Sequence, residues 1–370
     1  MKKEKKERRK LIIDGNLLAR KSFYKFRELK STILVKNLGY LSKKVKEQTV
    51  TLKKEEENKF VSDGSGRIIN IKENSRIEGK INQIIAEEGV VSLNTGVLYG
   101  MLRSILVAYG KFKIEEVIIC YDPVYHKDNG IQLRKEINSE YKNRKKDPDT
   151  EREFNLALSL AQSFFYKIGI LQVTTTKFEA DDILQYYTHK IFKEEECIIL
   201  TNDHDLFQLL EPNRVKMLRL GVNPDLYTAK KFKEEYKISS KQYKDVLVLG
   251  GCSTDNVKGV KGISEKSAID LIREFKSLKI LLKKYKTSSN KRAITALDKD
   301  KKTGFKSLKE SYRLVSLYGL KKELKDDLSI IKSSKSPEIR YKQAITFLKI
   351  LKFKSFLTKS AKKSLKLLIS

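Results

Sequence analysis

Three short apolar runs that lead into aspartates constrain the fold of this chain more than any other feature. They are residues 11–13 before Asp14, residues 117–121 before Asp122, and residues 197–200 before Asp203. Each run is rich in Ile or Val, as is typical of strands buried on both faces of a parallel sheet. Segments with apolar residues at helical spacing lie between them, at residues 96–110, 154–169 and 180–192. This alternation predicts an α/β fold with a parallel sheet.

The composition changes along the chain and predicts two domains. Residues 1–10 form a basic tail, residues 11–225 the α/β core, and residues 226–370 a helical domain with a helix–turn–helix at about 245–275. Residues 30–93 are polar and Lys/Glu-rich, and they are too long for an ordinary connection. We therefore expect an insertion there, with a small hairpin around the DGSGR segment at residues 63–67.

Carboxylates gather where the predicted strands end and where the next helices begin. The set comprises Asp14, Asp122, Glu179, Asp181, Asp182, Asp203, Asp205 and Asp255. The carboxyl ends of neighbouring parallel strands converge on one crevice, so the strand-terminal members should meet. So many carboxylates would repel each other strongly without cations. Two hard divalent ions, Mg²⁺ or Mn²⁺, about 3.5–4 Å apart would neutralise them and support phosphodiester hydrolysis.

Each carboxylate also has a purely structural explanation. Asp181 and Asp182 would stabilise a helix N-terminus, Asp255 would cap a turn, and Asp14 would sit in a DGN turn. The joint pattern favours the metal centre.

The charge balance points to a polyanionic partner. Lys and Arg number 78 against 47 Asp and Glu, giving a formal net charge of +31, and nucleic acid is the leading candidate. A Lys bias inherited from an AT-rich genome is the alternative explanation. Cys120, Cys197 and Cys252 lack CxxC spacing, which argues against a zinc ribbon or a disulfide framework. With no membrane-length apolar run, we expect a cytoplasmic protein, in the host cytoplasm if it is phage-encoded.

The motifs together resemble one family. LIIDGN (11–16), IICYDP (118–123), FEADD (178–182), LTNDHDL (200–206) and TDNVKGVKGISEKSA (254–268) match signatures of the 5′-nuclease or flap endonuclease superfamily. That superfamily includes phage flap endonucleases, phage ribonuclease H and the 5′-3′ exonuclease domain of bacterial DNA polymerase. The resemblance covers most of the chain. It implies a PIN-like parallel-sheet core followed by a helical domain with a helix–three-turn–helix.

The resemblance also implies roles for the carboxylates. Asp14, Asp122, Glu179 and Asp181 would form the tighter metal site. Asp182, Asp203, Asp205 and Asp255 would complete the cluster or hold a second ion. The segment GGCSTDN departs from the family pattern, which usually has an Asp where Cys252 stands. A thiol suits softer metals better than Mg²⁺, so we expect a weakened second ion or a preference shifted toward Mn²⁺.

Nucleic-acid contacts follow from the same resemblance. In the helix–three-turn–helix, Gly259 and Gly262 would let the backbone approach a phosphate, Lys258, Lys261 and Lys266 would add charge, and a K⁺ ion would bind. Residues 123–150 resemble the helical arch. There Tyr141 would stack on a base while Lys142 and Arg144 act on the scissile phosphate, with Lys145 as the alternative to Arg144. Arg20 would touch a phosphate. A solvated basic loop and an ordinary helical hairpin are the plainer explanations.

The predicted function is a divalent-metal-dependent 5′-3′ exonuclease or flap endonuclease of replication or repair. Its partners would be DNA with a 5′ flap, a nick or a free 5′ end, or an RNA/DNA hybrid, and the protein would act as a monomer away from membranes. Two rivals stay open: a PIN-type ribonuclease, which lacks the GVKGI segment, and a catalytically decayed protein that binds branched DNA.

Overall fold

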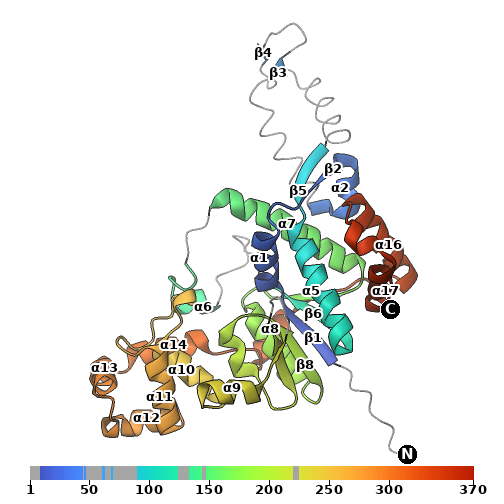
Figure 1. Ribbon diagram of the computed structural model, residues 1–370. Helices are drawn as coiled ribbons and strands as arrows, with labels where there is room; N and C mark the ends of the chain where they lie inside the picture. Colours follow the sequence, from blue (N-terminus) through green and yellow to red (C-terminus); the bar gives the residue numbers. More distant parts are fainter. Residues whose placement is uncertain are drawn as a thin grey trace, which may run out of the picture. The chain divides into compact units, whose positions relative to one another are not determined.

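A seven-stranded sheet carries the predicted apolar runs (Figure 1). The computed structural model describes residues 9–44, 46, 61–62, 68–69, 90–123, 133–143, 147–219 and 225–370. The strand order is β10-β9-β8-β1-β6-β7-β11. The strands are β1 (Arg9–Asp14), β6 (Ile114–Cys120), β7 (Leu171–Thr174), β8 (Glu196–Leu200), β9 (Val215–Leu218), β10 (Leu226–Tyr227) and β11 (Ser329–Ile331). The three predicted strands are therefore confirmed.

The register of the sheet brings three strand ends to one edge. Strand β1 pairs in parallel with β6 on one side and β8 on the other, with Asp14 opposite Cys120 and Ile13 opposite Leu200. Residues 11–13 are wholly buried, which explains why the run is continuously apolar instead of alternating. The carboxyl ends of β6, β1 and β8 thus form one edge of the sheet.

Two compact units make up the chain, and each is assembled from separate segments. The first comprises Met1–Leu17, Phe112–Lys145 and Val173–Ile330; the second comprises Leu18–Lys111, Lys146–Gln172 and Ile331–Ser370. The division expected from the sequence was linear. The interleaving arises because a parallel sheet needs long crossovers, which leave room for the chain to build a second unit between strands.

The first unit contains the helices nearest the strand ends. They are α6 (Leu133–Ile137), α8 (Ala180–Tyr186), the π-helix η2 (Tyr187–Ile191) and the 3₁₀-helix η3 (His204–Leu209). Its helical part contains α9 (Ala229–Tyr236), η4 (Ser240–Gln242), α10 (Tyr243–Gly250), η5 (Ser253–Asp255), α11 (Glu265–Phe275), α12 (Leu278–Lys284), η6 (Tyr285–Thr287), α13 (Lys291–Lys302), α14 (Lys306–Val315) and α15 (Lys322–Asp327). Helix α10 packs against both α11 and α14.

The second unit holds most of the predicted insertion and the end of the chain. It contains α2 (Val35–Leu41), α5 (Gly96–Phe112), α7 (Pro148–Lys167), α16 (Pro337–Ile350), η7 (Lys354–Leu357) and α17 (Lys359–Ile369), and it receives α1 (Gly15–Lys25). Helix α16 packs on α7, with the rings of Phe347 and Phe164 5.1 Å apart (Figure 1). Residues 331–370, expected within the helical DNA-binding domain, therefore belong to this unit.

Parts of the predicted insertion are regular structure. Strands β2 (Lys30–Leu34) and β5 (Val90–Asn94) pair antiparallel, and the Ser31 hydroxyl donates to the carbonyl of Leu351 at 2.9 Å. Strands β3 (Val61–Ser62) and β4 (Ile68–Ile69) also pair antiparallel, on either side of the DGSGR segment. The segment itself lies outside the described residues. Of the helices in the described part of the chain, none is long and apolar enough to span a bilayer.

Candidate active site

Four aspartates meet at the carboxyl edge of the sheet, and we call them the first cluster: Asp14, Asp122, Asp181 and Asp203. Asp14 is the last residue of β1, Asp122 follows β6, Asp181 lies in the first turn of α8, and Asp203 caps η3 after β8. Burial and the charges of Asp122 and Asp203 raise the pKa of Asp14 to about 7. Burial also raises the pKa of Asp181 well above its usual value; Lys142 opposes this, and Asp203 and Asp14 add to it. The predicted convergence is therefore present.

Hydrogen bonds hold these carboxylates in place. Asp14 accepts from the backbone N–H of Leu17 and from the hydroxyl of Thr201, each at 3.1 Å. Asp122 accepts from the backbone N–H of Ala180 at 2.9 Å, which joins the end of β6 to the start of α8. Burial raises the pKa of Asp122, although Lys142 opposes the effect. The cluster is a fixed set of oxygen acceptors.

A second cluster lies beside the first and consists of Asp205, Cys252 and Asp255. One ligand atom from each residue lies within 4.8 Å of the others, and all three side chains are half-buried. Burial, followed by the charges of Asp203 and Asp255, raises the pKa of Asp205 to about 7. The thiol of Cys252 makes a hydrogen bond to Asp205. Because Asp203 raises the pKa of both Asp14 and Asp205, it links the two clusters electrostatically.

Lys142 brings a positive charge to both clusters. Its Nζ lies 3.0 Å from Glu179 Oε2 and 3.5 Å from Asp255 Oδ2, and the side chain is 35% exposed. Its backbone is in the left-handed region at φ 51°, and its N–H donates to the Asp255 carbonyl at 3.1 Å. Burial disfavours the ammonium, but the surrounding acidic groups, led by Glu179, outweigh it and raise the pKa of Lys142. The charged form of the ammonium is therefore favoured, and the side chain is still partly open to solvent.

Tyr141 does not occupy the position that base stacking would require. Its side chain is only 3% exposed, and its hydroxyl lies 3.1 Å from Glu179 Oε2 and 3.2 Å from Asp255 Oδ2. A buried ring offers no free face to a base, so the stacking role expected for Tyr141 is wrong in this structure. Its hydroxyl instead bridges two carboxylates.

Glu179 differs from the first cluster because it is compensated. It caps α8 in a capping box with Asp182, and its Oε2 accepts from Tyr141, Lys142 and Arg134. Burial alone would raise the pKa of Glu179, but Lys142 and Arg134 outweigh it and hold the pKa below its usual value. Glu179 is therefore an anion whose charge is already matched.

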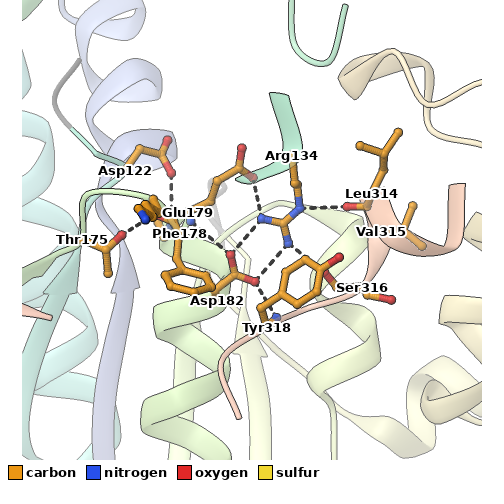
Figure 2. Close-up of polar contacts among 12 residues, drawn as sticks. Asp122, Arg134, Thr175, Phe178, Glu179, Asp182, Leu314, Val315, Ser316 and Tyr318 are labelled. Atoms are coloured by element: carbon orange, nitrogen blue, oxygen red, sulfur yellow. Dashed lines mark hydrogen bonds and ion pairs between the residues drawn. The ribbon is translucent and has the colours of Figure 1, made fainter. Parts of the chain in front are cut away.

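Arg134 is a buried residue beside the site that the sequence did not reveal. Figure 2 shows its guanidinium between the Asp182 carboxylate and the carbonyls of Leu314 and Ser316. Two donors go to Asp182 at 2.8 and 3.0 Å, one to Glu179 at 3.3 Å, and two to the carbonyls at 2.8 and 2.9 Å. All five N–H groups are satisfied. A single Arg in the polar segment RKEINSEYK carries no pattern that would mark it as buried.

Asp182 consequently has no oxygen left for a metal ion. It is 0% exposed, binds Arg134 in a bidentate pair, and accepts from the backbone N–H groups of Tyr318 at 2.7 Å and Glu179 at 3.1 Å. Four bonds fill the usual capacity of a carboxylate. The metal-ligand role predicted for Asp182 is replaced by a structural ion pair, and Gly319, whose added Cβ would lie 2.2 Å from the Asp182 carbonyl, allows the loop after α14 to pack there.

The helix–three-turn–helix segment presents its lysines to solvent. Lys258, Lys261 and Lys266 are exposed, and α11 begins after the N-cap Ser264. A Cβ on Gly259 (φ 60°) would lie 2.4 Å from the N of Gly251, so this glycine is required by contact with the end of α10. Gly262 (φ 98°) is exposed, and a Cβ there would contact nothing closer than 3.7 Å. Gly262 is therefore the better placed of the two for approaching a phosphate.

The remaining predicted nucleic-acid residues lie elsewhere. Arg20, in the second unit, makes a bidentate ion pair with Glu151, in which Nη1 lies 2.6 Å from Oε1, and its guanidinium lies 3.5 Å from the Phe154 ring centroid. These internal partners occupy it and compete with the phosphate contact expected for it. Arg144 and Lys145 lie outside the described residues.

The donor chemistry of the two clusters fits divalent cations unequally. The first cluster offers only carboxylate oxygens, the ligands that Mg²⁺ and Mn²⁺ prefer. The pKa values of Asp14 and Asp181 are raised because too little positive charge lies near these carboxylates. A bound divalent ion would supply that charge. The second cluster includes a thiol, which is a poor ligand for Mg²⁺.

Comparison with protein families gives a consistent assignment. The model of the 5′-3′ exonuclease N-terminal resolvase-like domain matches residues 81–237, and that of the 5′-3′ exonuclease C-terminal SAM fold matches residues 238–332. The chain belongs to the 5′-3′ exonuclease family. The resemblance found in the sequence motifs is thereby confirmed, and the two family models meet between α9 and α10.

Relatives of this family cover part of the chain. A 5′-3′ exonuclease of Bacillus subtilis is 32% identical over 205 residues, covering 54% of this chain and 65% of that protein. A DNA polymerase I of Caldicellulosiruptor bescii is 32% identical over 194 residues, covering 50% of this chain and 22% of the polymerase. The chain thus spans less than two thirds of the length of these relatives.

Solved structures confirm the fold. A bacteriophage T5 flap endonuclease in a complex with DNA and metal ions matches with a TM-score of 0.54 at 15% identity, covering 93% of this chain and all of that one. A T5 protein crystallised with metal ions matches with the same score and coverage of 93% and 99%. These matches support the predicted α/β core with a helical C-terminal part.

Proposed function

We propose that this chain is a divalent-metal-dependent 5′ nuclease that hydrolyses phosphodiesters in DNA, acting as a 5′-3′ exonuclease and flap endonuclease at single-strand/duplex junctions. The observation that carries the proposal is the first cluster, in which aspartates from three strand ends and one helix start lie so close together that the charges of Asp122 and Asp203 raise the pKa of Asp14, and those of Asp203 and Asp14 raise the pKa of Asp181. A fold does not maintain such repulsion for stability, since replacing these groups would relieve it. Membership in the 5′-3′ exonuclease family agrees with the proposal.

The hard cation would be held by the first cluster, Asp14, Asp122, Asp181 and Asp203. Glu179 lies beside them, but its ion pairs already balance its charge. Mg²⁺ or Mn²⁺ bound there would activate water and neutralise charge on the phosphate. Hydrogen bonds from Leu17, Thr201 and Ala180 orient the carboxylates of Asp14 and Asp122. Burial of the site limits the screening of these charges by bulk water.

Lys142 would act on the scissile phosphate. Its ammonium is 35% exposed and lies beside both clusters, so a phosphate oxygen can approach it from solvent. Glu179 and Asp255 are the partners of Lys142 in this structure. A phosphate oxygen could replace one of these carboxylates, and the ammonium would still have an anionic partner. A preorganised cation of this kind stabilises the charge that builds up in the transition state.

The exposed lysines of the helix–three-turn–helix would grip the duplex. Lys258, Lys261 and Lys266 face solvent near the N-terminus of α11, and Gly262 leaves room for a phosphate. Contacts of this type read the backbone, so we propose little sequence preference, a role for K⁺ at the same turn, and substrates that include nicks and RNA/DNA hybrids. Replication and repair would supply such substrates.

A cleavage assay tests the proposal. A labelled 5′-flap duplex and a blunt duplex are incubated with the full chain in Mg²⁺, Mn²⁺ or EDTA, and product sizes are resolved. We expect cutting near the junction that requires metal and falls about 100-fold in Lys142→Ala. Lys230→Ala is the matched control, since its side chain is 85% exposed and pairs with Glu234 at 4.0 Å. Tight binding without cutting in either metal would identify a binding-only protein instead.

A further inference from the structure

The second cluster has a donor set unlike the first. Asp205, Cys252 and Asp255 place two carboxylate oxygens and a sulfur within 4.8 Å of one another. In a tetrahedral site with bonds of about 2.0–2.3 Å, ligand atoms lie about 3.5 Å apart, so small side-chain rotations would close this group around an ion. Among the described residues, this is the group whose ligand atoms meet the spacing of a metal site.

The backbone holds two of these ligands at a constant spacing. Cys252 and Val257 exchange backbone hydrogen bonds of 2.9 Å in both directions, closing a loop that contains η5 and Asp255. Gly251 precedes the loop at φ 75°, where a Cβ would lie 2.4 Å from the Val257 carbonyl oxygen. The loop is therefore tightly constrained, and Cys252 and Asp255 extend from it as a pair.

Asp205 is brought to this pair by the end of β8. Its backbone N–H donates to Asp203 at 2.8 Å, which ties the second cluster to the first. The Cys252 sulfur lies 2.8 Å from the Thr254 hydroxyl and is half-buried, whereas Cys120 and Cys197 are 0% exposed within β6 and β8. Cys252 is thus the cysteine, of the three, that an ion from solvent can reach.

We infer that Asp205, Cys252 and Asp255 form a cation site selective for thiophilic divalent ions such as Zn²⁺, Co²⁺ or Cd²⁺ over Mg²⁺, beside a first cluster that favours hard ions. Soft thiolate ligands select such metals, whereas carboxylates alone suit Mg²⁺ and Mn²⁺. Binding breaks the Cys252 S–H bond, releases its proton to solvent and forms a metal–sulfur bond, with no change of oxidation state. The inference deepens the proposed function, on which it rests, by assigning an ion class to its second site.

Spectroscopy of a metal–sulfur bond tests the inference. The full chain is titrated with Cd²⁺ in the presence of excess Mg²⁺, and the ultraviolet thiolate-to-cadmium charge-transfer band is followed. We expect a band that saturates at one ion per chain and is abolished in Cys252→Ser and in Cys252→Asp. Cys120 and Cys197 remain in every variant and serve as internal controls. Asp205→Asn should weaken Cd²⁺ binding at least about tenfold with the band retained at high Cd²⁺.

The outcomes separate this inference from the nuclease proposal. A wild-type protein that gives no band, or a band that survives in Cys252→Ser, overturns the inference even if flap cleavage in Mg²⁺ is normal. A Cys252-dependent band in a protein that cleaves nothing supports the inference and counts against the nuclease proposal alone. Should Cys252→Ser unfold, Cys252→Asp provides the same test, because its added carboxylate supplies an oxygen ligand and should tighten Mg²⁺ binding while removing the band.

Discussion

Asp181 and Asp182 are consecutive residues at the start of one helix, yet they have opposite electrostatic environments. Asp181 lies among Asp203, Asp14 and Glu179, and burial with these charges raises its pKa well above the usual value. Asp182 lies against Arg134, with both oxygens bonded to the guanidinium and to backbone N–H groups. Successive side chains on a helix point about 100° apart, so one faces the strand ends and the other the loop after α14. We therefore propose that Asp181 serves the metal site and Asp182 the stability of the fold.

The largest expected effect is the loss of cleavage in Asp181→Asn. Removing one carboxylate from the first cluster should lower kcat on the order of 1,000-fold, because a divalent ion contributes several kcal/mol to the transition state. The melting temperature without metal should stay the same or rise, since a repulsive charge is removed. Flap cleavage and thermal unfolding of the same preparation give both values. Asp270→Asn is the control, since Asp270 lies on α11, is about half exposed and pairs with Arg273. A lower melting temperature would contradict the assignment.

Asp182→Asn should show the opposite pattern. Breaking one partner of a buried ion pair leaves the Arg134 charge uncompensated and should destabilise the fold by about 3–5 kcal/mol. Denaturant unfolding measures the change, and cleavage by the fraction still folded should fall far less than in Asp181→Asn. If Asp182→Asn is as inactive as Asp181→Asn while fully folded, Asp182 acts in catalysis and the division is wrong.

A double replacement distinguishes a structural Arg134 from a positioning one. Arg134→Met with Asp182→Leu removes both charges and should recover much of the stability lost in either single variant. Activity should remain low, because Arg134 also donates to Glu179 at 3.3 Å and ties α6 to the carbonyl of Leu314 at 2.8 Å. The comparison of kcat with unfolding free energy is the readout. If kcat and the unfolding free energy both recover in the double variant, Arg134 has a purely structural role. The single variant Arg134→Lys keeps the positive charge and should keep part of the activity.

The pH dependence of stability should also reflect the first cluster. The pKa of Asp14 is about 7 in the folded protein, against an ordinary value of 3.8. The folded state therefore holds a proton that the unfolded state has lost, so in EDTA stability should fall as pH rises from about 4 to about 7. Bound Mg²⁺ should flatten this decline. Melting temperatures across that range, with and without Mg²⁺, test it; Asp14→Asn should show a weaker slope, and an unchanged slope would argue against the shift.

The smallest effect concerns charges that face outward. Replacing Lys258, Lys261 or Lys266 singly by Ala should leave stability unchanged and weaken duplex binding modestly. The slope of log affinity against log salt should fall by about 0.9 for each phosphate that the variant no longer neutralises. Binding to a nicked duplex at several salt concentrations measures the slope. Lys230→Ala should leave it unaltered. Equal slopes in all four variants would place the DNA-binding surface elsewhere.

The strands and most of the site followed from local features of the sequence. The runs at β1, β6 and β8 were recognisable because burial on both faces demands continuous apolar residues, and convergence of Asp14, Asp122 and Asp203 follows from parallel pairing. Periodicity also located α5, α7 and α8. The 3₁₀-helix that begins between Asp203 and Asp205 has no such pattern, and the spacing over residues 180–192 did not show that the helix changes from α to π at Tyr187, since both features depend on local packing.

Sequence alone determined the fold class, the family and the convergence of the aspartates that end the strands, because each of these depends on repeat spacing or on short motifs. Tertiary structure alone decided which acidic group receives a counter-ion. Arg134 pairs with Asp182, which is 48 residues away in the sequence, and Arg20 pairs with Glu151, which is 131 residues away. It also decided that the Tyr141 ring is buried and that the thiol of Cys252 faces two carboxylates. Electrostatic partnership depends on distance in space, and residue types in sequence do not specify that distance.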